Sequence, residues 1–158
     1  MRNTIHGRRS HQAPDAHGER KPPRVIVAED EADVRQLVAV ALRGLGYEIV
    51  EASSGADLLD KLGDVLIHDD VAGRPDVIIS DIRMPGLTGL EILAGLRQAD
   101  WPTAIVLMTA YADLDTREEA MRLGADALFA KPFDIDDLMT AVVNMTAMPP
   151  RDPKDRPH

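Results

Sequence analysis

The chain has no cysteine and no long apolar run, and both absences exclude kinds of protein. Without a thiol there is no disulfide framework, no cysteine nucleophile and no cysteine-ligated zinc. No stretch approaches the roughly 18 apolar residues of a membrane span. The basic first residues lead into no apolar segment, so they do not form a secretory signal. We therefore expect a soluble, cytoplasmic protein with no membrane partner.

Length and charge indicate one acidic domain between two terminal segments. With 158 residues, 44% of them hydrophobic, the chain suits a single well-packed domain. Residues 25–148 carry nine Lys or Arg against 23 Asp or Glu, a formal net charge of −14. Such a body repels the phosphates of nucleic acids, so we expect no DNA-binding domain.

The terminal segments differ from this body in composition. Residues 1–23 are rich in Arg, His, Pro and Gly, which predicts a disordered basic arm. Residues 149–158 carry four prolines and alternating charges, which predicts a disordered tail. We interpret the arm as solvated, and contact with a metal, an acidic partner or nucleic acid is the alternative. Its candidate contact residues are His6, Arg8, Arg9, His11 and His17.

Between the two ends, short apolar runs alternate with amphipathic segments. Five runs predict buried strands: 25–28, 47–50, 77–80, 104–108 and 127–130. Helical spacing predicts five helices: 34–45, about 55–66, 88–99, from 113 or 115 to 123, and one capped by Asp134. Leu59 and Val143 are among the residues expected to face the core. This alternation predicts an α/β fold, a parallel sheet with helices on both faces.

Polar side chains follow four of the predicted strands. Glu29 and Asp30 follow the first strand, and Asp81, Thr109 and Lys131 follow the third, fourth and fifth. In an open α/β sheet, ligands bind at the carboxyl ends of the strands. Three carboxylates gathered there repel one another unless a cation is present, and Mg²⁺ prefers oxygen ligands of this kind. The sequence therefore predicts a small acidic Mg²⁺ site with one lysine.

Such a site can accept a phosphoryl group on an aspartate. The metal neutralises phosphoryl charge so that a carboxylate attacks phosphorus, and Lys131 and Thr109 each contact a phosphoryl oxygen. Taken singly, each residue has a plainer interpretation. Asp30 or Glu31 begins a helix, Asp81 lies in a turn, Thr109 is a helix N-terminal hydroxyl, and Lys131 is a solvated loop lysine. Their joint occurrence at the strand ends favours the site.

The segments 25–31, 78–86, 106–110 and 129–133 resemble those of a response-regulator receiver domain of bacterial two-component signalling. The resemblance covers about residues 24–148. It implies a flavodoxin-like doubly wound five-stranded parallel sheet of strand order 2-1-3-4-5.

Carried over residue by residue, the resemblance assigns roles to the polar residues. Asp81 matches the phosphoacceptor, Asp30 the direct Mg²⁺ ligand and Glu29 the acid that acts through water. The backbone carbonyl of Arg83 matches the third protein ligand. Thr109 and Lys131 match the switch hydroxyl and the phosphate-binding lysine, and Lys131-Pro132 resembles the family's cis peptide.

The chain departs from the family pattern at three places. Glu29-Asp30 stands where two aspartates are common. Leu128 occupies the position of the usual switch aromatic, and the neighbouring Phe129 is expected on the other face of its strand; Tyr111 or the helix after it reports the state instead. The segment Gly63–Gly73 is longer than usual, and we interpret its His68-Asp69-Asp70 as part of a solvated loop rather than a binding site.

The resemblance implies a signalling protein rather than an enzyme. We expect a stand-alone receiver, because no effector domain follows the last helix, with a histidine kinase or histidine phosphotransfer protein as phosphodonor. Output is expected through protein contacts at residues 115–147, or by phosphorelay. One alternative is a phosphorylation-independent pseudo-receiver, but such proteins usually lack the acceptor or the lysine. Another is a phosphatase of the haloacid dehalogenase type, which needs an aspartate where Arg83 stands.

Overall fold

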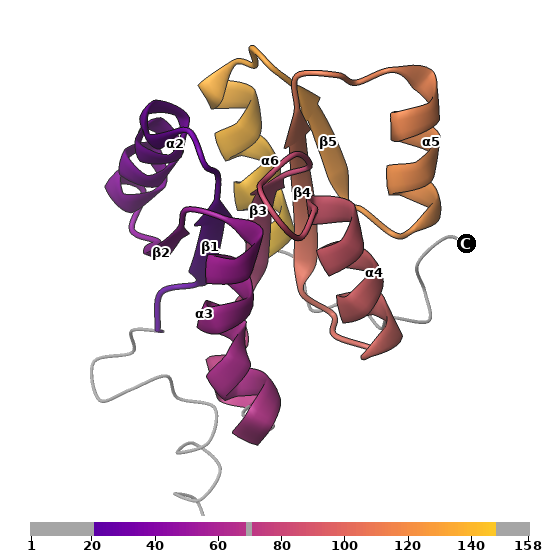
Figure 1. Cartoon of the computed structure of the whole chain (residues 1–158). Coiled ribbons are helices and arrows are strands. Elements are labelled where there is room, and N and C mark those ends of the chain that lie inside the picture. The colour runs from indigo at the N-terminus through magenta and orange to yellow at the C-terminus, as the bar shows by residue number, and fades with distance from the viewer. Residues whose placement is uncertain (1–20, 69–70, 148–158) are drawn as a thin grey trace, which may run out of the picture.

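Five parallel strands form one sheet between two layers of helices in the computed structural model, which describes residues 21–68 and 71–147 (Figure 1). The order is β2-β1-β3-β4-β5. Both the predicted fold class and the predicted strand order are confirmed. Most of the basic arm, the C-terminal tail and Asp69-Asp70 lie outside the described residues. The strands are β1 (Arg24–Ala28), β2 (Glu48–Ala52), β3 (Val77–Asp81), β4 (Ala104–Thr109) and β5 (Ala127–Ala130).

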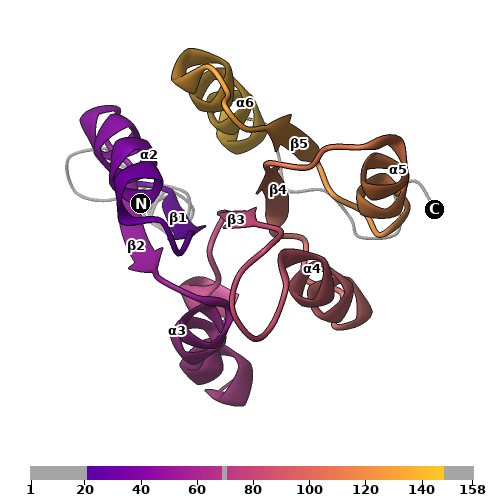
Figure 2. The same cartoon turned by 45° about the horizontal axis from the view of Figure 1, so that its top comes forward.

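Helices cover both faces of this sheet. Figure 2 shows α2 and α6 on one face and α3, α4 and α5 on the other. The helices are α2 (Ala32–Gly44), α3 (Gly55–His68), α4 (Gly89–Gln98), α5 (Leu114–Arg122) and α6 (Ile135–Ala147), with a short 3₁₀ helix η1 (Val71–Gly73) before β3. No helix in the described ranges is both long and apolar enough to cross a bilayer.

The core consists of two hydrophobic clusters, one on each face of the sheet. Side chains of a strand alternate between faces, so Val25 and Val27 pack under α2 and α6 while Ile26 packs under α3. The central strand β3 is buried along its whole length. Burial on both faces explains why the strand sequences are continuous apolar runs.

The strand register brings the carboxyl ends of the strands to one edge. Ala28 is paired with Ser80, Asp81 with Met108, and Thr109 with Ala130. The residues that follow these strands therefore share one end of the sheet, as the sequence predicted.

Helix starts follow the capping residues in the sequence. Thr88 caps α4 by accepting from the Glu91 amide, and the Glu91 side chain accepts from the Thr88 amide in return. Asp113 caps α5 through a 2.8 Å bond from the Thr116 amide. That bond holds the pKa of Asp113 below its usual value, because it favours the charged carboxylate.

Leu37 and Leu45, on the apolar stripe predicted for the first helix, are each 52% exposed, and two residues expected to face the core are exposed as well. Leu59 is 44% exposed and Val143 is 41% exposed. Each directly follows a buried residue, Leu58 or Val142, and one helical step of about 100° turns it away from the sheet. Prediction from apolar character alone therefore made the buried stripe of these helices too wide.

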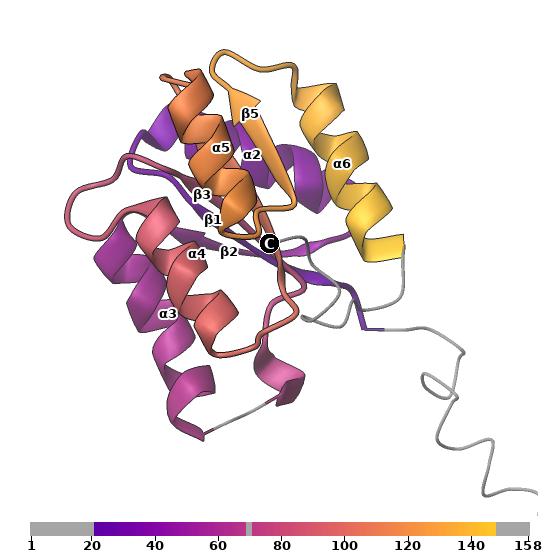
Figure 3. The ribbon, with the colours of Figure 1, turned by 90° about the vertical axis from the view of Figure 1, so that its right-hand side faces the viewer.

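The segment expected as a long loop before β3 is partly helical. Helix α3 continues through His68, and η1 follows at Val71–Gly73. Figure 3 shows the C-terminal turns of α3 extending beyond the end of α4. His68, which was expected in a solvated loop, is therefore the last residue of a helix.

A buried ion pair fastens α4 to the sheet. Arg97 on α4 contacts Asp126, which precedes β5, at 3.2 Å, and the side chains are 12% and 3% exposed. Asp126 also accepts a 2.8 Å bond from the Ile105 amide on β4. Arg97 donates further bonds to the carbonyls of Trp101, Thr103 and Gly124.

We predict that Asp126→Ala lowers the free energy of unfolding by about 3 kcal/mol, because it leaves the Arg97 charge buried without its acidic partner. Urea denaturation measures this. Lys61→Ala is the matched control: its pair with Asp57 is exposed on α3, and its loss costs at most about 0.5 kcal/mol. Equal effects of the two substitutions would contradict the prediction.

Candidate functional site

Three acidic side chains meet at the carboxyl edge of the sheet. Glu29 and Asp30 follow β1, and Asp81 ends β3. Glu29 is completely buried, Asp81 is 5% exposed, and Asp30 is exposed. One carboxylate oxygen from each residue lies within 4.8 Å of the others. The structure thus brings together the three acids that the sequence singled out.

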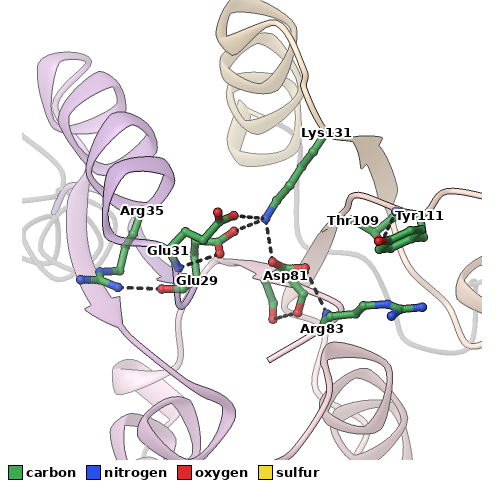
Figure 4. A network of polar contacts seen from close by, with 9 residues as sticks. Glu29, Glu31, Arg35, Asp81, Arg83, Thr109, Tyr111 and Lys131 are labelled. Atoms are coloured by element: carbon green, nitrogen blue, oxygen red, sulfur yellow. Dashed lines mark hydrogen bonds and ion pairs between the residues drawn. The ribbon is translucent and has the colours of Figure 1, made fainter. Parts of the chain in front are cut away.

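Lys131 reaches into this group from the end of β5. Its Nζ donates to Glu29 Oε1 at 2.6 Å and to Asp81 Oδ2 at 2.7 Å (Figure 4). A third contact, to Glu31 Oε1, is 3.4 Å long. The Lys131-Pro132 peptide is cis, as predicted. The ammonium group therefore neutralises part of the charge that gathers at this edge.

Burial and ion pairing act on the same groups. Burial raises the pKa of Glu29 from 4.5 to about 7, although the bonds from Lys131 and the Glu31 amide oppose the shift. For Lys131, burial alone would lower the pKa, but the hydrogen bonds to Asp81 and Glu29 outweigh it and the pKa is raised. Lys131 is therefore a permanent cation, while Glu29 loses its charge as the pH falls below neutrality.

The three carboxylates fit a hard divalent cation. Mg²⁺ binds oxygens at about 2.0–2.1 Å, so two ligands on opposite sides of the ion lie roughly 4 Å apart. The 4.8 Å limit that encloses the three oxygens is compatible with this geometry. The exposure of Asp30 leaves room for the waters that Mg²⁺ retains.

Arg83 and Thr109 flank the acidic group. The Arg83 amide donates to Asp81 Oδ1 at 3.0 Å, which orients that carboxylate. Thr109 ends β4, is 1% exposed and accepts a bond from the Tyr111 amide at 3.0 Å. Its carbonyl accepts from the Lys131 amide at 2.8 Å, which joins the ends of β4 and β5. The ligand role of the Arg83 carbonyl stays a prediction.

Sequence reasoning missed two residues that support this site. Glu31 occupies the N-cap position of α2, as its plainer interpretation held, but its side chain forms no cap and contacts Lys131 instead. Arg35 donates to the Glu29 carbonyl at 2.7 Å and to the Glu51 carboxylate at 3.3 Å. The only sequence signal was an arginine one turn into a helix that follows an acidic triplet.

The departures at β5 are confirmed structurally. Leu128 belongs to the cluster under α3, α4 and α5, whereas Phe129 faces α2 and α6. The Phe129 ring meets Phe133 edge to face, with centroids 6.2 Å apart. Tyr111 is the aromatic residue next to Thr109, 60% exposed, with the Arg83 guanidinium 4.4 Å from its ring centroid.

The start of α4 packs closely against the Asp81 strand end. A Cβ on Gly89 would lie 2.6 Å from the Asp81 carbonyl oxygen and 3.2 Å from the Ile82 Cα. Both neighbours are backbone atoms, which cannot turn aside. Only glycine therefore permits this approach, which places the loop after Asp81.

Comparison with known proteins identifies the family. Residues 25–143 match the response regulator receiver domain, and the chain belongs to this family. Receiver domains are signalling modules that interact with histidine kinases or phosphotransfer proteins and bind Mg²⁺ at an acidic pocket.

Individual relatives agree with this assignment. Sporulation initiation phosphotransferase F of Bacillus subtilis (strain 168) is 34% identical over 119 residues, which cover 75% of this chain and 90% of the relative. Regulatory protein AtoC of Escherichia coli (strain K12) is 36% identical over 115 residues, 73% of this chain but 23% of AtoC. The chain thus spans about a quarter of AtoC and most of Sporulation initiation phosphotransferase F.

Among solved structures, the response regulator TrrA from Thermotoga maritima, in complex with Mg²⁺ and BeF, is similar to this chain. The TM-score is 0.65 at 32% identity, and the match covers 78% of this chain and 98% of TrrA.

We predict that Gly89→Ala lowers the free energy of unfolding by about 1–3 kcal/mol, because the new methyl group overlaps the backbone at Asp81. Gly95→Ala on the same helix is the matched control. Beyond the backbone of its own helix, no atom lies within 4 Å of a Cβ at that position, so alanine should stabilise the helix by up to about 1 kcal/mol. Thermal and urea unfolding measure both variants, and a neutral Gly89→Ala would contradict the close packing.

Proposed function

We propose that this protein is a phosphorylation-dependent receiver that accepts a phosphoryl group on Asp81 from a phosphohistidine of a partner protein. The observation that carries the proposal is the meeting of Glu29, Asp30, Asp81 and Lys131 at one edge of the sheet. The proposed folded unit is residues 24–148, with the arm 1–23 and the tail 149–158 outside it. The proposal also includes the cytoplasmic location that the composition led us to expect.

The geometry suits in-line attack by the Asp81 carboxylate. A carboxylate oxygen attacks phosphorus, the P–N bond to the donor imidazole breaks, and the imidazole leaves and takes up a proton from solvent. Bound Mg²⁺ would supply charge neutralisation on the phosphoryl oxygens, held by Asp30 and Asp81, by Glu29 through water, and by the Arg83 carbonyl.

Lys131 and Thr109 complete the proposed acceptor site. The Lys131 ammonium, now shared between Asp81 and Glu29, can exchange the Asp81 oxygen for a phosphoryl oxygen with little movement. The buried Thr109 hydroxyl can donate to a second phosphoryl oxygen. Both groups stabilise charge that exists only after transfer, so they favour the phosphorylated state.

Output is proposed through the surface of α5, β5 and α6, about Asp115–Ala147, either to a protein target or to a phosphotransfer protein in a relay. The proposal also includes the expectation that the receiver acts by itself rather than as part of a longer protein. Asp81 and Lys131 are both present and paired, which disfavours a pseudo-receiver. Arg83 in place of the second aspartate disfavours a phosphatase of the haloacid dehalogenase type.

We predict that acetyl phosphate with Mg²⁺ adds one phosphoryl group to the protein, measured by intact mass. Asp81→Asn should abolish the addition, because an amide is not a nucleophile toward phosphorus. Asp60→Asn, an exposed acid on α3, is the control and should be labelled normally. Chelation of Mg²⁺ should also prevent labelling. Labelling that persists in Asp81→Asn would reject Asp81 as the acceptor.

We further predict that Arg83→Ala and Tyr111→Ala each change the rate of dephosphorylation several-fold, because the two side chains flank the acidic site and can alter how water reaches a phosphoryl group on Asp81. The free energy of unfolding should change by less than about 1 kcal/mol, since both side chains are exposed and a cation–π pair at an exposed site contributes little. Loss of phosphoprotein over time measures the rate. Lifetimes equal to that of the parent protein would count against the prediction.

A further inference from the structure

Tyr111 lies on a short connection whose two ends are anchored. Only residues 110–112 join the end of β4 at Thr109 to the cap of α5 at Asp113. Thr109 is held by the 2.8 Å bond from the Lys131 amide to its carbonyl, and Asp113 by the 2.8 Å bond from the Thr116 amide. A change at Thr109 therefore cannot be absorbed along a long loop and must act on Tyr111.

Two contacts hold Tyr111 in its exposed position, and one of them leads back to the proposed phosphoacceptor. The Tyr111 amide donates to the Thr109 hydroxyl at 3.0 Å, and the ring lies against the Arg83 guanidinium at 4.4 Å. Arg83 in turn donates its amide to Asp81 Oδ1 (Figure 4). Across residues 21–68 and 71–147, the Thr109 hydroxyl accepts one hydrogen bond and donates none, so its hydrogen is available to an oxygen that arrives at Asp81.

A cavity of about 590 Å³ opens beside the Tyr111 ring. Its lining includes Met84, Thr88, Leu90 and Thr116, together with Tyr111 itself, and no residue of β5. The volume is large against the ~30 Å³ share of one liquid water, so an aromatic ring can enter. Leu128 is packed into the hydrophobic cluster instead, which leaves this space without an aromatic from β5.

We propose that Tyr111 is the aromatic switch of this receiver and moves into this cavity when Asp81 is phosphorylated; the inference rests on the proposed function. The phosphoryl group adds negative charge and oxygen acceptors at Asp81. The Thr109 side chain rotates so that its hydroxyl can donate to a phosphoryl oxygen, and this rotation carries the hydroxyl oxygen away from the Tyr111 amide. The Arg83 guanidinium is drawn to the same charge, because a charged hydrogen bond to phosphate is stronger than an exposed cation–π contact.

Burial of apolar area then favours movement of the released Tyr111 ring. At 60% exposure it presents apolar area to water, and the cavity beside it offers apolar walls from Met84 and Leu90. The movement removes Tyr111 from the surface next to Leu114, which is 68% exposed at the start of α5. Phosphorylation would thus change the surface presented to a partner without a change of fold.

The chain contains only two tyrosines, which makes the movement directly measurable by ¹⁹F NMR after labelling with 3-fluorotyrosine. Tyr47 is an internal control, because its hydroxyl is bonded to Thr146 at 2.7 Å, away from the acidic site. Tyr111→Phe assigns the two resonances. The probe is Mg²⁺ with beryllofluoride, whose own bound fluorine signals report occupancy at Asp81 in the same spectrum.

When beryllofluoride binds, we expect the ¹⁹F resonance of Tyr111 to shift. The difference between its chemical shifts in H₂O and D₂O, the solvent isotope effect, should fall at least about twofold as an exposed ring becomes buried. The Tyr47 resonance should not change. In Thr109→Ala the Tyr111 amide has no hydroxyl acceptor, so the Tyr111 isotope effect should already be lowered before loading and should change little when beryllofluoride binds. Arg83→Ala should lower the Tyr111 isotope effect even before loading, because one restraint is gone.

Two results would overturn the proposal, and they are distinguishable. Bound beryllofluoride with an unchanged Tyr111 isotope effect would reject the switch and leave the proposed phosphoacceptor function intact. Absence of bound beryllofluoride signals in the parent protein would reject the proposed function and the switch with it.

Discussion

The ammonium group of Lys131, placed among carboxylates, is the interaction on which the site depends. Glu29 is fully buried and Asp81 nearly so, and two such acids close together would otherwise be driven to protonate. The contacts of 2.6 and 2.7 Å to Lys131 provide a fixed positive charge that keeps the acids together. In the proposed function, a metal ion would take over the carboxylates and the ammonium would turn to a phosphoryl oxygen. The carboxylates whose negative charge Lys131 offsets are therefore also the groups that can bind a cation.

The parallel sheet makes this concentration of charge possible. Parallel strands end at the same edge, and the register pairs Asp81 with Met108 and Thr109 with Ala130, so residues from four strands meet in a small volume. The hydrophobic layers on either side fix the strands, and the Arg97–Asp126 pair and the close approach of Gly89 fix α4 against them. Asp81, Thr109 and Lys131 thus lie at strand ends, whereas Tyr111 lies on the connection that follows Thr109.

The strand runs were sufficient to predict the fold class, because burial on both faces requires continuous apolar sequence. The polar residues after them were sufficient to predict that Glu29, Asp30, Asp81 and Lys131 meet at one edge of the sheet, because parallel strands end together. The errors have one common source. Leu59 and Val143 were assigned to the core since they are apolar and adjacent to core positions, but each lies one helical step beyond the face that meets the sheet. Helix α3 also extends to His68, which was expected in a solvated loop. Gly63 lies within this helix, as the predicted range implied, because the cost of a single glycine is small against the packing of a helix.

What the amino-acid sequence determined by itself was the chemistry available: which side chains can bind a cation, attack phosphorus or donate to a phosphate, and that they follow buried strands. What only the tertiary structure decided was which of them touch. Contacts of Lys131 with Glu31, of Arg35 with the Glu29 carbonyl, and of Arg83 with the Tyr111 ring depend on the angles at which helices and loops leave the sheet. Those angles result from packing among many residues, and no local pattern along the chain encodes them.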